Sequence, residues 1–244
     1  MPISRVFQNC ALIEGTSLAL DANASHHLSR VLRAKQGDEL IIFNGLGGEY
    51  IATITHIDKK AVHVRIAAFD PREAESPLDL WLAQGISRGE KMDYTIQKAV
   101  ELGVKKIIPL FTERCTVKLD EERLHKRLEH WQSIAIHAAE QSGRNRIPDI
   151  LAPTTLEKAL PLLQTPWRFA LSPHVTQKLH TIQIDKLQSV LLLIGPEGGL
   201  SEHEILFTKA HHFLPLNLGP RIMRTETAAV AAITALQCYF GDMS

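Results

Sequence analysis

The fold of the second part of this chain is decided by residues 190–199, which read Val190-Leu191-Leu192-Leu193-Ile194-Gly195-Pro196-Glu197-Gly198-Gly199. The five apolar residues predict a strand buried on both faces, which is typical of a parallel strand with helices on each side. A glycine-rich turn follows, and Ser201 with Glu204 forms a capping box that starts a helix. This stretch therefore predicts a strand, a turn and a helix of an α/β domain.

The residues around this stretch continue the alternation of strands and helices from residue 78 to the end. Further strands are expected at 78–82, Lys106 to Leu110, Arg168 to Leu171 and His212 to Leu216. One long helix is expected from an apolar stripe with steps of three and four residues, made of Leu124, Leu128, Trp131, Ala135 and Ala138.

The last helix, expected from about Glu226 to Phe240, carries two apolar stripes. One consists of Ala229, Ile233, Leu236 and Phe240, and the other of Ala228, Ala232, Ala235 and Tyr239. A helix that is apolar most of the way round is buried, either in the core or in a contact between subunits. The stripes alone do not separate these two alternatives.

The first seventy residues differ, because they read as short strands and one early helix. Strands are expected at Glu39 to Phe43, Glu49 to Ile57 and Ala61 to Phe69, and their close spacing predicts a small barrel. For the helix, Asn23 and Ser25 are the N-cap candidates. Its expected apolar face consists of Leu28, Val31 and Leu32.

Residues 70–77, Asp-Pro-Arg-Glu-Ala-Glu-Ser-Pro, interrupt all periodicity and contain two prolines. We place the domain boundary there, with one domain at residues 1–72 and a second at residues 73–244.

Composition excludes several classes of protein. The 244 residues include 27 Lys plus Arg and 27 Asp plus Glu, so a formal net charge of zero argues against a uniformly basic nucleic-acid binder. No apolar run reaches the ~18 residues of a membrane span and the first residues show no signal-peptide pattern, so a cytosolic protein is expected. The three cysteines, Cys10, Cys115 and Cys238, do not suit a disulfide framework, and the missing ligand spacings predict no metal site.

Two further loops follow predicted strands, as the glycine-rich turn does. Residues Leu218 to Ala228 hold Arg221, Arg224 and Glu226 before the last helix, and Leu171-Ser172-Pro173-His174 form the other loop. The carboxyl ends of parallel strands meet at one edge of a sheet, where α/β proteins bind small molecules. Plain tight turns and a surface pair of Arg224 with Glu226 remain the alternatives. Neither a phosphate-loop motif nor a dinucleotide motif is present.

Residues 87–146 hold twelve Lys or Arg and nine acids, and several of the arginines lie in predicted loops. Arginines of this kind suit bidentate contacts to phosphate. For Arg144 and Arg146 there is an alternative, because cations at the C-terminus of a helix also complement the helix dipole.

Motifs throughout the chain resemble the uridine-N3 methyltransferases of small-subunit (16S) ribosomal RNA, the RsmE type of the SPOUT superfamily. The motifs are His26-His27-Leu28, Val31-Leu32-Arg33, Phe43-Asn44-Gly45, Ser87 to Met92, Glu101 to Val104, Glu140-Gln141 with Arg144, Ile194 to Gly199, and Leu218 to Ala228. Met223 is a mild departure, at a position where leucine is more usual.

The resemblance implies an N-terminal PUA-like RNA-binding β-barrel and a C-terminal α/β domain with a parallel sheet and a trefoil knot. It implies S-adenosyl-L-methionine as the cofactor, a homodimer formed through the SPOUT domain, and 16S ribosomal RNA or the assembled small subunit as the partner. The implied cofactor-binding residues are Leu171, Ser172, Ile194, Gly195, Pro196, Gly198, Gly199, Leu218, Gly219, Ile222, Met223 and Thr225. The expected RNA-binding residues are Arg5, Arg30, Arg33, Arg88, Lys91, Arg114, Arg144 and Arg146.

Methylation of N3 requires loss of the imide proton and stabilisation of the charge that develops on the uracil oxygens. We hypothesise that Arg224, oriented by Glu226, faces the base, and that Glu197 lies near the sulfonium or the N3 proton. The alternatives are a methyltransferase of the same superfamily that acts on a ribose 2′-hydroxyl or a transfer RNA base, and a non-catalytic RNA-binding ribosome assembly factor.

Overall fold

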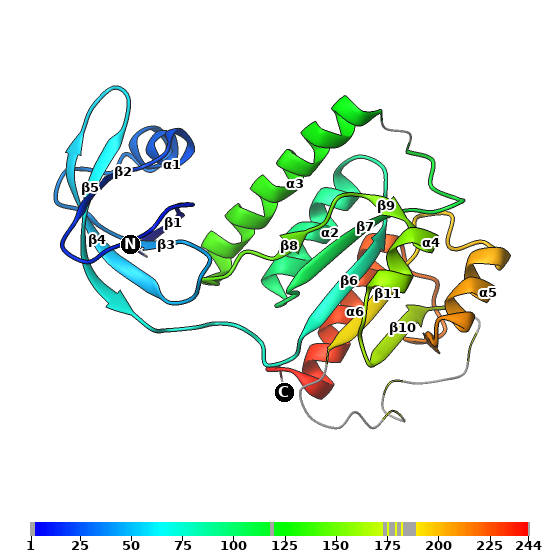
Figure 1. Ribbon diagram of the computed structural model, residues 1–244. Coiled ribbons are helices and arrows are strands. Elements are labelled where there is room, and N and C mark those ends of the chain that lie inside the picture. Colours follow the sequence, from blue (N-terminus) through cyan, green and yellow to red (C-terminus); the bar gives the residue numbers. More distant parts are fainter. Residues whose placement is uncertain are drawn as a thin grey trace. The chain divides into compact units, whose positions relative to one another are not determined.

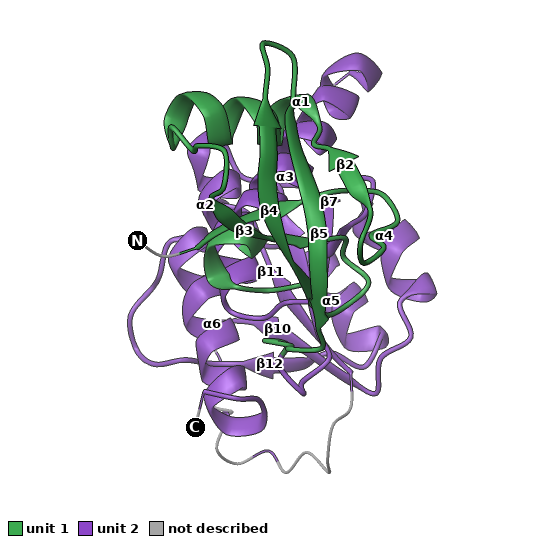
Figure 2. Cartoon of the chain, turned by 90° about the vertical axis from the view of Figure 1, so that its left-hand side faces the viewer, with its two compact units in different colours: residues 1–75, 139–147 green, residues 76–138, 148–244 purple. Residues whose placement is uncertain are grey.

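A computed structural model describes residues 3–117, 120–172, 175, 179, 182 and 189–243 of the chain. The chain forms two compact units, which Figure 2 distinguishes by colour. Unit 1 comprises residues 1–75 and 139–147, and unit 2 comprises residues 76–138 and 148–244.

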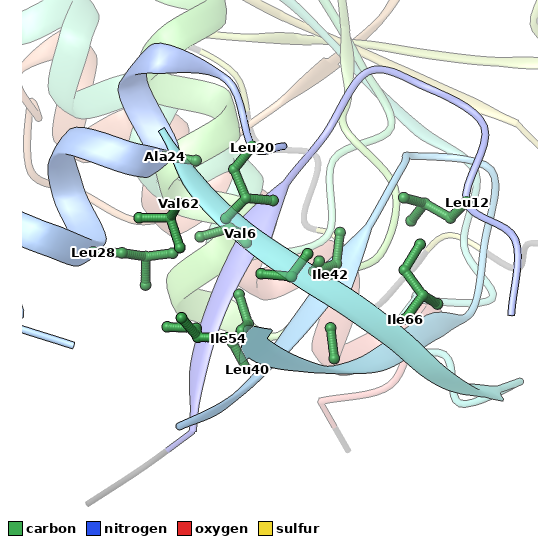
Figure 3. Close-up of a cluster of buried hydrophobic side chains, with 12 residues drawn as sticks. Val6, Leu12, Leu20, Ala24, Leu28, Leu40, Ile42, Ile54, Val62 and Ile66 are labelled. Carbon is green, nitrogen blue, oxygen red and sulfur yellow. The ribbon is translucent and has the colours of Figure 1, made fainter. Parts of the chain in front are cut away.

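Unit 1 is a five-stranded sheet with one short helical segment. The strands are β1 (Ser4–Phe7), β2 (Ser17–Ala19), β3 (Glu39–Phe43), β4 (Glu49–Ile57) and β5 (Val62–Asp70). Their order is β1-β3-β4-β5-β2, with β1 parallel to β3 and the other neighbours antiparallel. Alternate residues of each strand face one apolar core, in which Val6, Leu40 and Ile54 meet Leu28 of the helical segment (Figure 3). The expected bounds of β3 and β4 are confirmed.

The helical segment differs from its expected form. It consists of α1 (Ala22–His26) and a π-helical turn, η1 (His27–Val31), and Asp21 caps it by accepting from the backbone N–H of Ala24. The expected N-caps, Asn23 and Ser25, are therefore wrong. The expected apolar face is wrong as well, because only Leu28 is buried while Val31 and Leu32 are 60% and 46% exposed. Val31 is the last residue of the π-helical turn and Leu32 is its C-cap, and the side chains of both face solvent at this end of the segment.

Residues 139–147 join unit 1 through charged and polar contacts. The Arg144 guanidinium donates to both carboxylate oxygens of Glu75, at 2.9 and 2.7 Å, and its side chain is 3% exposed. Glu140 accepts from the backbone N–H of Phe7. Arg5 donates to Glu49 and to the Asn145 side chain. These contacts place two of the expected RNA-binding arginines, Arg5 and Arg144, inside the unit, where their location favours a structural role.

Unit 2 is a parallel sheet with helices on both faces (Figure 1). Its described strands are β6 (Leu80–Gly85), β7 (Lys106–Phe111), β8 (Asp149–Ile150), β9 (Thr154–Thr155), β10 (Trp167–Leu171), β11 (Val190–Ile194) and β12 (Leu214–Leu216). Its helices are α2 (Glu90–Glu101), α3 (Glu121–Ser142), α4 (Leu156–Ala159), η2 (Leu160–Leu162), α5 (Glu202–Ala210) and α6 (Thr225–Phe240). The strand order is β12-β10-β11-β6-β7-β8, with β9 beside β7.

Strand β11 has the expected bounds, and all five of its residues are buried. On one face, Leu191 and Leu193 pack in a cluster with α4, η2 and Phe207 of α5. On the other side, α6 packs against α2 and β11. The prediction of a central strand covered by helices on both sides is confirmed.

Strand β12 begins at Leu214 instead of the expected His212, because the end of α5 occupies the preceding residues. The backbone N–H of His212 bonds to Lys209, and His212 has a φ of 61°. A residue in this left-handed conformation does not continue a strand.

One stability prediction concerns the Arg144–Glu75 pair. Arg144→Ala leaves the Glu75 carboxylate largely buried without its partner, so we expect unfolding free energy to fall by about 3–5 kcal/mol. Urea unfolding followed by circular dichroism measures the loss. Arg146→Ala is the matched control, because its side chain is 52% exposed and lies 3.7 Å from Glu73. It should cost less than about 1 kcal/mol, and equal losses would contradict a structural role specific to Arg144.

Candidate functional site

The candidate site lies at the edge of unit 2 where the parallel strands end. Because β6, β7, β10, β11 and β12 are parallel neighbours, the segments that follow them emerge at the same edge of the sheet. The segments are 86–89, 112–116, 172, 195–199 and 217–224. Their hydrogen bonds to one another define the site.

The backbone after β11 approaches the end of β6 more closely than any side chain would allow. A Cβ built on Gly85 would lie 2.5 Å from the nitrogen of Pro196 and 2.9 Å from the carbonyl carbon of Gly195. The turn itself closes when the Gly199 N–H donates to the carbonyl of Pro196, with Gly199 at a φ of 68°. Glycine is therefore required at Gly85 by contact and favoured at Gly199 by conformation.

Thr225, the first residue of α6, ties the last loop to this turn. Its hydroxyl donates to the carbonyl of Gly195 at 2.7 Å and accepts from the side-chain amide of Gln84 at 3.0 Å. Both Thr225 and Gln84 are buried. Arg224 occupies the N-cap position of α6 and makes no capping bond with its side chain. The Thr225 hydroxyl instead joins three elements of the sheet edge.

Glu197 is held by the start of α2. One of its carboxylate oxygens accepts from Lys91 Nζ at 3.0 Å and from the Arg88 backbone N–H at 3.1 Å. Partial burial works against ionisation, but hydrogen bonds from its own backbone N–H, Lys91 and Arg88 outweigh it and lower the pKa of Glu197. The carboxylate therefore stays charged at neutral pH, and its stabilising effect is lost only as the pH falls through this lowered pKa. A carboxylate of this kind is a weak proton acceptor.

The loop after β7, residues 112–116, also contacts the glycine turn 195–199. Arg114 donates to the carbonyl of Gly198 at 3.1 Å, and Arg88 Nε donates to the hydroxyl of Thr116 at 2.6 Å. The Glu113 N–H donates to the side chain of Glu204, which also completes the capping box of α5 with Ser201. Hydrogen bonds with Ser201 and then with His203 lower the pKa of Glu113. These bonds fix the loop backbone and leave the charged groups at the surface.

The loop before α6 is more exposed than the turn after β11. Ile222 is 83% exposed, and Gly219 and Arg224 are exposed too. The first residues of the loop are held by Asn217. Its side-chain amide donates to the carbonyl of Val175 and accepts from the Gly219 N–H. Ser172 is fixed by the carbonyl of Leu216 at 2.9 Å. Pro173 and His174, part of the third expected loop, lie outside the described residues.

The expected catalytic residues are not joined as hypothesised. No hydrogen bond or ion pair links Arg224 to Glu226 within the part of the chain that the structure describes. Arg224 is exposed, whereas one oxygen of Glu226, Oε2, is buried without a hydrogen-bond partner. Gln84 Oε1, which the sequence did not single out, is also buried without a partner. Gln84 lies inside a strand with no distinguishing pattern, so sequence reasoning had no signal for it.

Three of the expected RNA-binding residues, Arg88, Lys91 and Arg114, lie at this edge of unit 2 and are wholly or partly exposed. Arg30 and Arg33 lie exposed in unit 1. Among the described residues no group of three or more His, Cys, Asp or Glu side chains could hold a metal ion. The described helices also include none that is long and apolar enough to cross a membrane.

Comparison with protein families matches both units. Residues 74–237 match a family described as "RNA methyltransferase domain", and residues 20–67 match "RNA methyltransferase PUA domain". The ribosomal RNA small subunit methyltransferase E of Buchnera aphidicola (subspecies Schizaphis graminum) is 39% identical over 246 residues, covering 99% of this chain and 98% of that protein. The protein of the same name from Bacillus subtilis is 31% identical and covers 91% of this chain and 90% of its own.

Two solved structures are similar over nearly the whole chain. A methyltransferase of Legionella pneumophila, in complex with bound SAM, is 42% identical with a TM-score of 0.96, and the match covers 99% of this chain and 100% of that one. A ribosomal RNA small subunit methyltransferase E of Neisseria gonorrhoeae, bound to S-adenosyl methionine, is 37% identical with a TM-score of 0.92 and the same coverage.

The bonds of Thr225 generate a second stability prediction. Thr225→Val keeps the shape of the side chain but removes the hydroxyl, which leaves the carbonyl of Gly195 without this donor and the Gln84 amide without this acceptor. We expect unfolding free energy to fall by about 1–3 kcal/mol in urea titrations. Thr225→Ser retains the hydroxyl and should lose much less. Equal losses for the two variants would assign the effect to the missing methyl group or to packing.

Proposed function

Because this chain belongs to the family of ribosomal RNA small subunit methyltransferase E proteins, we propose that it methylates N3 of a specific uridine in 16S ribosomal RNA. Family and enzyme class rest on full-length relatives at 31–39% identity. The choice of uridine N3 rests on the motifs that the chain has in common with the uridine-N3 type. The observation that carries most is the glycine turn 195–199, fixed against Gly85 and Thr225 at the strand edge.

The methyl donor is S-adenosyl-L-methionine, which the Legionella and Neisseria structures contain. The residues of this chain fit such a group. Where a Cβ would stand on Gly199 or Gly219, nothing lies within 4 Å, so the backbone of both loops is open to a close ligand. We assign the binding to the backbone of Gly195 to Gly199, to Leu218 to Thr225, and to Leu171 and Ser172. The donor supplies an electrophilic methyl group.

The residues of the chain would prepare the uracil for transfer. Arg224 is exposed at the start of α6, where a guanidinium can stabilise the negative charge that develops on the uracil oxygens. Glu197 is held ionised by Lys91 and by the Arg88 N–H, which suits a charge placed near a sulfonium better than an acceptor of the N3 proton. Glu226 has one buried oxygen without a partner and remains the candidate to orient a group supplied by substrate.

The remaining parts of the proposal concern assembly and location. We propose a homodimer formed through α6, since Val230, Ala231, Thr234 and Ala235 are only partly buried and Tyr239 is exposed. We also propose, on the resemblance to the SPOUT superfamily, that unit 2 forms a trefoil knot. The bond from the Thr225 hydroxyl to the Gly195 carbonyl brings the start of α6 back to the loop after β11, and such a knot requires these two segments to be close. Action on ribosomal RNA would make this a cytoplasmic enzyme of ribosome biogenesis, with 16S ribosomal RNA or the assembled small subunit as its substrate.

Loss of the gene should remove 3-methyluridine from 16S ribosomal RNA. Nucleoside mass spectrometry of RNA from a deletion strain, with and without a plasmid copy, measures the change. We expect the nucleoside to disappear and to return with the plasmid. Unchanged 3-methyluridine would contradict the proposal, and loss of a 2′-O-methyl or transfer RNA nucleoside would favour the alternative substrates. An assembly defect without loss of any methylated nucleoside would favour an assembly factor.

If Glu197 and Arg224 have the proposed roles, substitution of either one should slow methyl transfer and leave cofactor binding intact. In single-turnover methyl transfer, Glu197→Gln and Arg224→Ala should each slow the reaction by about 10²-fold, as loss of one preorganised charge typically does. Calorimetry should show that both variants still bind the donor. Arg123→Ala, on the exposed face of α3, is the control and should react at the parent rate. Near-normal rates for the two variants would remove these roles.

A further inference from the structure

The arginines of unit 1 fall into two groups. Arg5, Arg72, Arg144 and Arg146 all lie within ion-pair distance of glutamates. Arg30, Arg33 and Arg65 form no hydrogen bond or ion pair to any described residue through their guanidinium groups, and all three are exposed. Arg65 lies on β5, whereas Arg30 and Arg33 lie close together at the helical segment of unit 1.

The backbone of this segment is unusual in two ways. The N–H of Leu32 bonds to the carbonyl of His27, five residues earlier, which makes the last turn a π turn. Arg33 then adopts a φ of 53°, a left-handed conformation that an L-residue with a side chain rarely occupies. Strained backbone of this kind, and single π turns, occur often at functional sites. Here the two features end the helix so that its last residues face solvent.

The same turn exposes apolar surface beside the cations. Val31 and Leu32 are 60% and 46% exposed, although Leu28 of the same segment is in the core. From His26 to Lys35 the sequence has three Lys or Arg and two His and no acidic residue. We name this surface, made of Arg30, Val31, Leu32 and Arg33, the π-turn surface. Its charge is complementary to a polyanion, and its apolar centre offers contact to something less polar than phosphate.

We propose that the π-turn surface binds an unpaired stretch of the substrate RNA, with Arg30 and Arg33 on phosphates and Val31 and Leu32 against an exposed base. Paired RNA presents mainly phosphates and 2′-hydroxyls, and apolar side chains add little to the affinity for such groups. Unpaired nucleotides expose the faces of their bases, against which apolar side chains can pack. The inference deepens the proposed function and rests on RNA being the substrate. It assigns RNA contact in unit 1 to this surface and not to Arg5 or Arg144.

Fluorescence polarisation with the full chain and two labelled RNA probes tests this surface. One probe is an unstructured single strand and the other a fully paired hairpin stem with a short stable loop. We expect Arg30→Ala to weaken binding of the single strand about tenfold and to reduce the salt slope of log affinity by about 0.7. The double variant Val31→Ser with Leu32→Ser should weaken binding of the single strand more than binding of the stem.

Arg33→Gly separates a role in binding from a role in folding. Glycine adopts the left-handed conformation freely, so the variant should melt at or above the temperature of the parent while its RNA affinity falls. A lower melting temperature with unchanged affinity would make Arg33 structural and overturn its assignment. Arg65→Ala is the matched control. Arg65 is exposed on β5 between Val64 and Ile66, which face the core with Leu28, so it points to the opposite face of the sheet.

Two outcomes would overturn the proposal. One is parent-like affinity of the π-turn variants for both probes, which would leave the surface free for a protein partner. The other is a loss as large for Arg65→Ala as for Arg30→Ala, which would indicate only general charge. Failure of this proposal differs from failure of the proposed function, because an enzyme with an irrelevant π-turn surface would still produce 3-methyluridine and bind its donor.

Discussion

The contact between Gly85 and the Gly195–Pro196 backbone is the constraint on which the candidate site depends. At 2.5 Å between a hypothetical Cβ and the Pro196 nitrogen, nothing larger than hydrogen fits there. Strand β6 and the turn after β11 can therefore lie against each other, and the Thr225 hydroxyl can reach the carbonyl of Gly195. Glu197 can reach the Arg88 N–H and Lys91 for the same reason. The site is thus fixed mainly by backbone, which suits recognition of a ligand by N–H and C=O groups.

The features that the sequence could predict are those set by residues close together in the chain, and the features that it could not predict depend on residues far apart in the chain. Strands β3, β4 and β11 have the expected bounds, because their patterns and turns are local. The alternation of strands and helices was also enough to predict a parallel sheet. The contact of Gln84 with Thr225 joins residues 141 positions apart, and neither residue carries a sign of it. The buried Gln237 of α6 is a second example: its side chain accepts from the Ser76 hydroxyl and donates to the carbonyl of Leu102.

The sequence-based predictions that were wrong for unit 1 have a common cause, which is that they treated each residue without its tertiary contacts. Counting residues on an ideal helix places Leu28, Val31 and Leu32 together, but the π turn and the left-handed Arg33 end that helix early. Likewise, the cations counted for RNA contact include two that glutamates hold inside the unit. A sequence gives the number of charges, whereas the fold decides which are neutralised. The bonds of Arg144 to Glu75 account for this arginine by packing within unit 1.

A net charge of zero acquires a different meaning once the pairs are known. Ion pairs within the fold leave the net charge unchanged, but they remove arginines such as Arg5 and Arg144 from contact with RNA. The cations that the candidate site and the π-turn surface present are localised: Arg30 and Arg33 lie beside the apolar π turn, and Arg88, Lys91, Arg114 and Arg224 lie at the strand edge of unit 2. Lys91 also neutralises Glu197, and Arg114 is bound to the Gly198 carbonyl, so each of them fixes the turn and can face substrate. An enzyme of zero net charge whose RNA-contacting cations are localised would hold RNA weakly except where several such contacts are made at once, and that requirement is itself a source of selectivity for one site in a folded RNA.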